Sequence, residues 1–203
     1  MKRAGIFIFT LFTLLSSSSF CQFRSIGFKF GYIRSIVFPM STEAKGINEG
    51  LFSEYAVHSN WLIRAEIIYT SEQASGEDWH NNETFTQKLG YIFIPLLIQY
   101  DLPVNFIIKP KIFLGPEISL LQSSKMGLDI HNGVIYWIDD KKDIKTTGYE
   151  FIFGAGGSYD WGSGKIDFDI RYKRGLNDLN KSPDDIATKM EAVSFNLGVG
   201  FTL

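Results

Sequence analysis

The chain has 203 residues, of which 45% are hydrophobic and 15% aromatic, and its formal net charge is −2 at pH 7. This net charge implies no polyanionic partner and the sequence has no basic patch, so nucleic acid is not an expected partner. The 18 Phe, 9 Tyr and 19 Gly residues instead favour strands joined by tight turns.

The N-terminus has the pattern of an export signal. Two basic residues precede an apolar run over 4–15, and small residues at Ser19 and Cys21 form an A-x-A-like cleavage site. We expect a signal peptide over 1–21 and one mature domain over 22–203. A lipid anchor on Cys21 is a weaker alternative, because the bulky residue before it does not suit such a site. Cys21 is the only cysteine, so the mature domain is expected to have no disulfide.

The mature chain alternates apolar and polar residues with a period of two. In the segment KIDFDIRYKR, for example, Ile166, Phe168, Ile170 and Tyr172 share one face, and acids and bases occupy the other. This period is typical of strands between an apolar and a polar medium. It predicts eight strands, over 24–36, 47–58, 61–71, 88–101, 107–121, 149–160, 165–175 and 192–203.

The connections between these strands alternate in length. A loop of medium length is expected over 37–46, and long ones over 72–87, 122–148 and 176–191. Short connections are expected at 59–60, 102–106 and 161–164. In an up-and-down meander the short turns then gather at one end and the long loops at the other. Transmembrane β-barrels show this asymmetry, with short periplasmic turns and long extracellular loops.

Strand length separates a membrane barrel from a soluble β protein, which is the competing fold. Several runs reach 10–14 residues, whereas strands in globular proteins are usually about 5–6 long and membrane strands need about 9–11. Trp61, Tyr159 and Trp161 lie beside short turns, where an interfacial aromatic girdle is expected. We predict an all-β fold, a single closed antiparallel transmembrane barrel of about eight strands.

Four segments carry a resemblance to a known family. In chain order they are YIFIPLLIQY, KIFLGPEISLL, IRYKRGLNDL and FNLGVGFTL. Together they resemble the Bacteroidota-type outer-membrane β-barrel family, often labelled porin family or PorT-like, over nearly all of 22–203. The resemblance implies a barrel in the outer membrane of a diderm bacterium, with outer-membrane lipid as its partner. It implies little about activity.

The polar faces of the predicted strands define a candidate lumen. An eight-stranded barrel is just filled by its inward side chains, and buried charges must be paired. We therefore expect a structural network of ion pairs that plugs the lumen, made of Lys29, Arg64, Glu66, Lys111, Glu117, Glu150, Asp167, Asp169, Arg171 and Lys173. The alternative is a path for ions or protons, which makes the protein a narrow channel or transporter.

The strand over 91–100 is apolar on both faces and leaves its facing open. Ile92, Ile94, Leu96 and Ile98 form one row, and Tyr91, Phe93, Pro95 and Leu97 form the other. One row is expected to face lipid and the other to pack in the lumen, and the sequence does not distinguish them.

Catalytic chemistry has weak support in the sequence. Asp167 and Asp169 share a strand face and suit acid–base work, but basic residues continue that face, so ion pairing is the favoured interpretation. The histidines His58, His80 and His131 lie on different connections without metal-site spacing. We expect no catalytic residue, no metal and no cofactor; an outer-membrane enzyme remains the second alternative.

The outward loops are the remaining candidates for binding. Trp79, Tyr136 and Trp137 lie among charged residues and suggest a surface for an unknown ligand or protein. The favoured alternative is that 131–138 forms a β-hairpin, turning at Asn132–Gly133, that extends the barrel wall beyond the membrane.

Overall fold

The computed structural model describes residues 22–38, 42–78, 83–130, 134–139, 141, 145–177 and 189–202. Its nine strands form one antiparallel sheet. Their bounds are β1 Gln22–Phe38, β2 Thr42–His58, β3 Trp61–Asp78, β4 Glu83–Asp101, β5 Lys109–Ile130, β6 Val134–Asp139, β7 Thr147–Trp161, β8 Gly164–Gly175 and β9 Lys189–Thr202. The described residues contain no helix that is long and apolar enough to cross a membrane.

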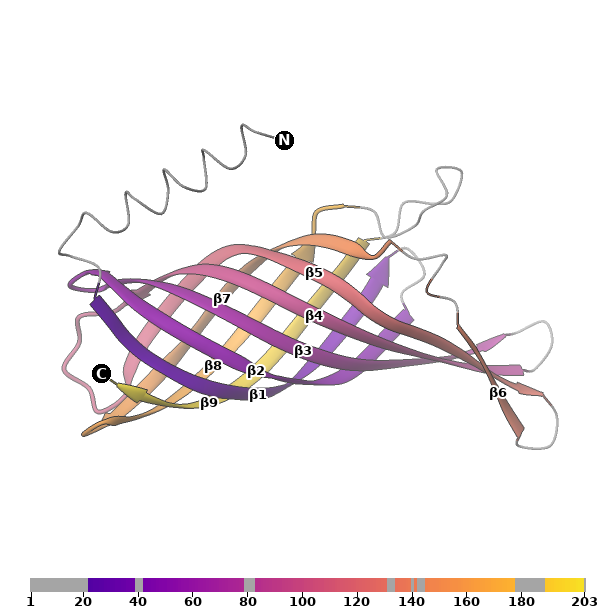
Figure 1. Ribbon diagram of the computed structural model, residues 1–203, viewed down its shortest axis with the longest axis horizontal. Coiled ribbons are helices and arrows are strands. Elements are labelled where there is room, and N and C mark those ends of the chain that lie inside the picture. The colour runs from indigo at the N-terminus through magenta and orange to yellow at the C-terminus, as the bar shows by residue number, and fades with distance from the viewer. Residues whose placement is uncertain are drawn as a thin grey trace.

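Eight of these strands close into a barrel, as predicted. Each strand pairs with its neighbours along the chain, β5 pairs with β7, and the circle closes where β1 pairs with β9 (Figure 1). The connections Ser59–Asn60, Gly162–Ser163 and the longer segment over 102–108 all lie at one end. All eight predicted strands are present.

The wall extends further than predicted at the opposite end. The predicted loop over 72–87 is wrong for most of its length, since β3 continues to Asp78 and β4 begins at Glu83. The same holds for part of 37–46, where β2 begins at Thr42. These segments are polar on both faces, so the hydrophobic period gives no signal, while the backbone ladder pairs them regardless of side chain.

The ninth strand, β6, belongs to this extension. It pairs with the end of β5 over Lys125–Ile130 and projects beyond the barrel (Figure 1). The predicted hairpin over 131–138 is therefore confirmed in its strands, while its Asn132–Gly133 turn lies outside the described residues. The predicted signal peptide over 1–21, with its predicted cleavage site at Cys21, also lies outside them.

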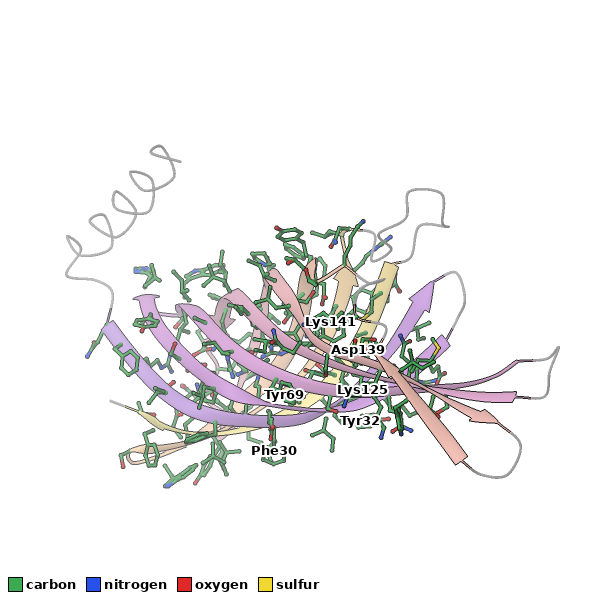
Figure 2. The ribbon with its side chains drawn as sticks, turned by 45° about the vertical axis from the view of Figure 1, so that its right-hand side comes forward. Phe30, Tyr32, Tyr69, Lys125, Asp139 and Lys141 are labelled. Atoms are coloured by element: carbon green, nitrogen blue, oxygen red, sulfur yellow. The ribbon has the colours of Figure 1, made fainter. Side chains whose placement is uncertain are left out.

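Apolar side chains cover the outside of the barrel and polar ones fill the inside. Figure 2 shows Phe30 and Tyr32 projecting from the outer face of β1, and both are exposed. Exposed aromatic residues with polar tips lie near both edges of the apolar band. Those toward the short turns are Tyr55, Trp61, Tyr159 and Trp161, and those toward the long connections are Tyr32, Tyr69, Tyr149 and Tyr172. Such a band between two aromatic girdles is the surface that a bilayer requires.

Strand β4 resolves the facing that its sequence leaves open. Tyr91, Phe93 and Leu97 are buried and face the lumen, together with Pro95. The row that contains Ile94, Leu96 and Ile98 faces outward. One side of the lumen is therefore apolar, and this matters for the charges that lie opposite.

Candidate functional site: the lumenal charge network

The group of charges nearest the short turns, called the inner group below, is organised around Arg64 on β3. Its Nη1 atom lies 3.0 Å from Asp167 Oδ1 and 3.2 Å from Glu54 Oε1. Lys111 pairs with the other oxygen of Asp167, and Lys165 pairs with Glu54. Four strands, β2, β3, β5 and β8, thus contribute to one ion cluster, because every second residue of each strand points to the same interior.

The middle of the network is organised around Arg171 on β8. Its Nη1 atom lies 2.7 Å from Glu66 Oε2, and its Nε atom lies 2.8 Å from Asp169 Oδ1. Lys29 bridges the same two carboxylates at 3.1 Å and 2.7 Å. The Asn196 amide donates a further hydrogen bond of 2.8 Å to Asp169. Glu66 also accepts from Arg64 Nε, so the inner and middle groups are continuous.

A third group lies nearer the long connections, at the start of β7 and the end of β8. Lys173 Nζ donates to Glu117 Oε1 at 2.6 Å. Glu150 is the direct cross-strand partner of Glu117, and Glu72 on β3 accepts a 2.7 Å hydrogen bond from Ser35. This outer carboxyl group, made of Glu72, Glu117 and Glu150 around Lys173, contains more acids than bases.

Aromatic and aliphatic side chains occupy the rest of the interior. Three cations lie over buried rings: Arg64 over Phe52 at 4.3 Å, Arg171 over Phe113 at 5.2 Å, and Lys173 over Phe93 at 3.9 Å. Each contact lets a cation face an apolar neighbour while its other side meets a carboxylate. Apolar clusters of Leu97, Phe113 and Ile152, and of Ile68, Tyr91, Phe93, Leu121 and Met190, complete the packing.

All ten residues that the sequence assigns to the lumen are buried, so their side chains lie inside the barrel and do not face lipid. The structure places seven of them, including Lys111, in the continuous inner and middle groups. The other three, Glu117, Glu150 and Lys173, belong to the outer carboxyl group. Three further members have the same burial but no place in the sequence-based set: Glu54, Lys165 and Glu72. The period-two rule indicates Lys165 directly, since it lies two residues before Asp167.

The other two omissions have separate causes. Glu54 lies on the strand with the weakest alternation in the sequence, so its facing has little support there. Glu72 falls in the segment expected to be a loop, whereas β3 continues through it. A separate, partly buried ion pair of Arg24 with Asp101, at 3.0 Å, lies at the short-turn end.

The proposed loop surface is only partly described. Trp79 lies outside the described residues. Tyr136 and Trp137 belong to β6, where they pair with Leu128 and Gly127 of β5. Trp137 is exposed, and the Lys88 ammonium lies 4.4 Å from its ring centroid. Nearby, Lys125 is the cross-strand partner of Asp139, and both are labelled in Figure 2.

The chemistry available in the lumen is electrostatic. Asp167 and Asp169 each contact two or more cations, which leaves neither free to act as a general base. Among the described residues, no group of three or more His, Cys, Asp or Glu side chains is arranged to hold a metal ion. The arrangement can hold strands together, block passage and bind protons.

Comparison with known proteins supports the same architecture. The structure of Neisserial surface protein A superposes with a TM-score of 0.57 at 15% identity, covering 90% of this chain and 99% of that one. OprG from Pseudomonas aeruginosa gives a TM-score of 0.56 at 13% identity, with 89% and 95% covered. At these identities the likeness shows the fold alone. No curated protein sequence gives a significant match.

A family model decides the assignment. The model described as outer membrane protein beta-barrel domain matches residues 18–181, most of the chain. Together with the inverted polarity, the two aromatic girdles and the closed sheet, this match identifies the protein as an integral outer-membrane β-barrel. The chain belongs to the outer membrane protein beta-barrel domain family.

Proposed function

We propose that the protein is an exported, non-conducting barrel of the PorT-like kind that acts by holding a binding surface outside the outer membrane. The observation that carries the proposal is the filled lumen. Arg64, Arg171, Lys111 and Lys165 are fully buried across the interior and are tied to carboxylates on opposite walls. Moving one of them aside for a solute leaves a buried charge unpaired, which costs several kcal/mol.

The extended strands support the second half of the proposal. The β3–β4 and β5–β6 hairpins continue past the outer aromatic girdle. Spanning the bilayer does not require this additional length of barrel wall. Trp137 and Lys88 form a cation–π pair there, and Lys141 Nζ donates to the Gln122 carbonyl at 2.8 Å. Aromatic side chains among charges are typical of contact surfaces. The partner is a ligand or protein in the extracellular medium, and no catalytic role is proposed.

Conductance in planar lipid bilayers tests the first half. We expect purified wild-type protein to give no steady single-channel current, because the side chains close the lumen. The matched variant removes two plug side chains, Arg64→Ala with Arg171→Ala, and is expected to give intermittent currents if it folds. Steady currents from the wild type would overturn the proposal in favour of the narrow-channel alternative.

Cysteine labelling on intact cells tests the second half. The exported domain over 22–203 lacks cysteine, so a single introduced thiol reports its own location. We expect Ile138→Cys in β6 to react with a membrane-impermeant maleimide, and Asn60→Cys in the short β2–β3 turn to react only after lysis. The reverse pattern would place the hairpin in the periplasm and remove the proposed role.

A further inference from the structure

The outer carboxyl group has an excess of acids that the rest of the lumen does not share. Glu72, Glu117 and Glu150 are at least 97% buried, and the one cation of the group, Lys173, is hydrogen-bonded to Glu117. The next cation along the same face of β8 is Arg171, which is already engaged by Glu66 and Asp169. Three ionised carboxylates would therefore face one ammonium in a poorly hydrated interior.

The geometry is least favourable between Glu117 and Glu150. They are direct partners across the β5–β7 ladder, and the Glu150 carboxyl lies within hydrogen-bonding reach of both Glu117 and Ser119. Like charges directly opposite each other destabilise a strand pair, and burial increases the repulsion. Two carboxyl groups that share such a site cannot both ionise at low cost.

The hydrogen bonds of this group are also incomplete. Glu72, Glu117 and Glu150 each have one buried carboxyl oxygen without a hydrogen-bond partner. A buried oxygen without a partner loses its hydration and gains nothing in return, so three together need an explanation. A proton held between Glu117 and Glu150 would turn one acceptor into a donor and remove both the repulsion and an unmet hydrogen bond.

The described parts of the surrounding strands supply no other compensating charge. Among the described residues, the groups that face this part of the lumen are Ser35 on β1, Asn48 on β2, Thr70 and Glu72 on β3, Tyr91 and Phe93 on β4, Glu117, Ser119 and Leu121 on β5, Glu150 on β7, Lys173 on β8, and Met190 and Ser194 on β9. Tyr91 is the additional titratable group, and a phenol supplies no cation. The carboxylates do not form a metal-binding arrangement within the described part of the chain.

We propose that the outer end of the lumen is a proton-binding site in which Glu117 and Glu150 share one proton at neutral pH. The middle network stays ionised because each of its carboxylates meets cations. Loss of the shared proton at higher pH places two negative charges across the β5–β7 ladder. The outer end of the barrel then weakens, while the ion pairs of Arg64 and Arg171 persist.

The direction of the pH effect follows from proton counting. An unfolded chain ionises both glutamates at neutral pH, whereas the folded barrel retains one proton. Because the native state binds the extra proton, stability falls as pH rises until that proton is lost. Relative to a variant without the site, the folded-to-unfolded ratio is expected to fall by up to about tenfold per pH unit in this window.

Infrared spectroscopy of the folded wild-type protein in micelles tests the proposal directly. We expect a carbonyl band of a protonated carboxyl group at pH 7 that disappears at alkaline pH and is absent in Glu150→Gln. The control Glu66→Gln, in the middle network, should keep the band and lose stability at every pH. Urea titrations from pH 6 to pH 9 then measure the slope for wild type and Glu150→Gln.

Three results would overturn the proposal. One is the absence of a protonated-carboxyl band in the wild type at pH 7, which needs no variant to fold. Another is a band that survives in both Glu150→Gln and Glu117→Gln, because the proton would then belong to a different group. A wild-type stability slope equal to that of Glu150→Gln would likewise remove the shared proton.

Discussion

A charge placed on the lipid-facing surface should destabilise the barrel according to its depth in the membrane. Leu197 on β9 is 39% exposed and pairs with Phe30 and Phe168, and Phe195 is 57% exposed and pairs with Tyr32 and Ile170. These neighbours are all apolar or aromatic and face the same way. An arginine at either position has no partner charge and little water.

The expected magnitude follows from the height of each position. Arg near the bilayer midplane costs about 2–4 kcal/mol, and near the interface about 0–1 kcal/mol. Ile36 is the matched control, since it lies on the same outer face of β1, six residues beyond Phe30. At about 3.3 Å per residue and a tilt of about 40°, it lies about 15 Å further along the membrane normal, outside the half-height of a band about 25 Å tall. Its cross-strand partners are Glu43 and Glu191.

Urea titration of barrels folded into lipid vesicles measures the effect, with heat-modifiable migration on gels as the folding check. Leu197→Arg should lower the folded-to-unfolded ratio by about 30-fold or more, since 1.4 kcal/mol corresponds to tenfold. Phe195→Arg, which lies opposite the girdle residue Tyr32, should lower this ratio by less than Leu197→Arg does. Ile36→Arg should change it by less than about fivefold. Equal losses at the three positions would show that depth does not set the cost and would refute the assigned position of the apolar band.

Two further substitutions test the interior and the short-turn end. Arg171→Met removes the guanidinium that joins Glu66 to Asp169 and should cost about 3–5 kcal/mol in the same titration. A loss below about 1 kcal/mol would mean that these pairs contribute little. Gly162 in the β7–β8 turn has a φ of 56°, so Gly162→Ala should cost about 1–2 kcal/mol, whereas Ser163→Ala next to it should be close to neutral.

The period-two pattern predicts most of the fold because the barrel lies between two media. Each outward residue must be apolar and each inward residue is free to be polar, so Asp167, Asp169 and Arg171 appear on one face of the sequence itself. The same rule is silent where the outward residues are polar as well, as Ser71, Gln73 and Ser75 are. That is why β3 and β4 extend through a segment that reads as a loop, and why Glu72 has no sequence signal.

The sequence does not predict which lumenal charges pair with one another. Lys29 and Asp169 are 140 residues apart and meet because β1 and β8 both flank β9. Strand period gives the facing of each residue but not the stagger between strands, which decides the height at which side chains meet. The excess of acids around Lys173 depends on that stagger and emerges only from the assembled barrel.

The interior charges also determine which face of each strand points into the lumen. Buried ion pairs are weak evidence for stability, since their desolvation offsets much of their attraction. A one-residue slip, however, turns every side chain of a strand to the opposite face. On β8 a slip would move Asp167, Asp169, Arg171 and Lys173 into lipid together, at a cost on the order of 10 kcal/mol. The apolar centre of β4 has no such penalty of its own. Its facing is fixed instead by pairing with β3 and β5, whose inward charges Arg64 and Glu117 tolerate only one register.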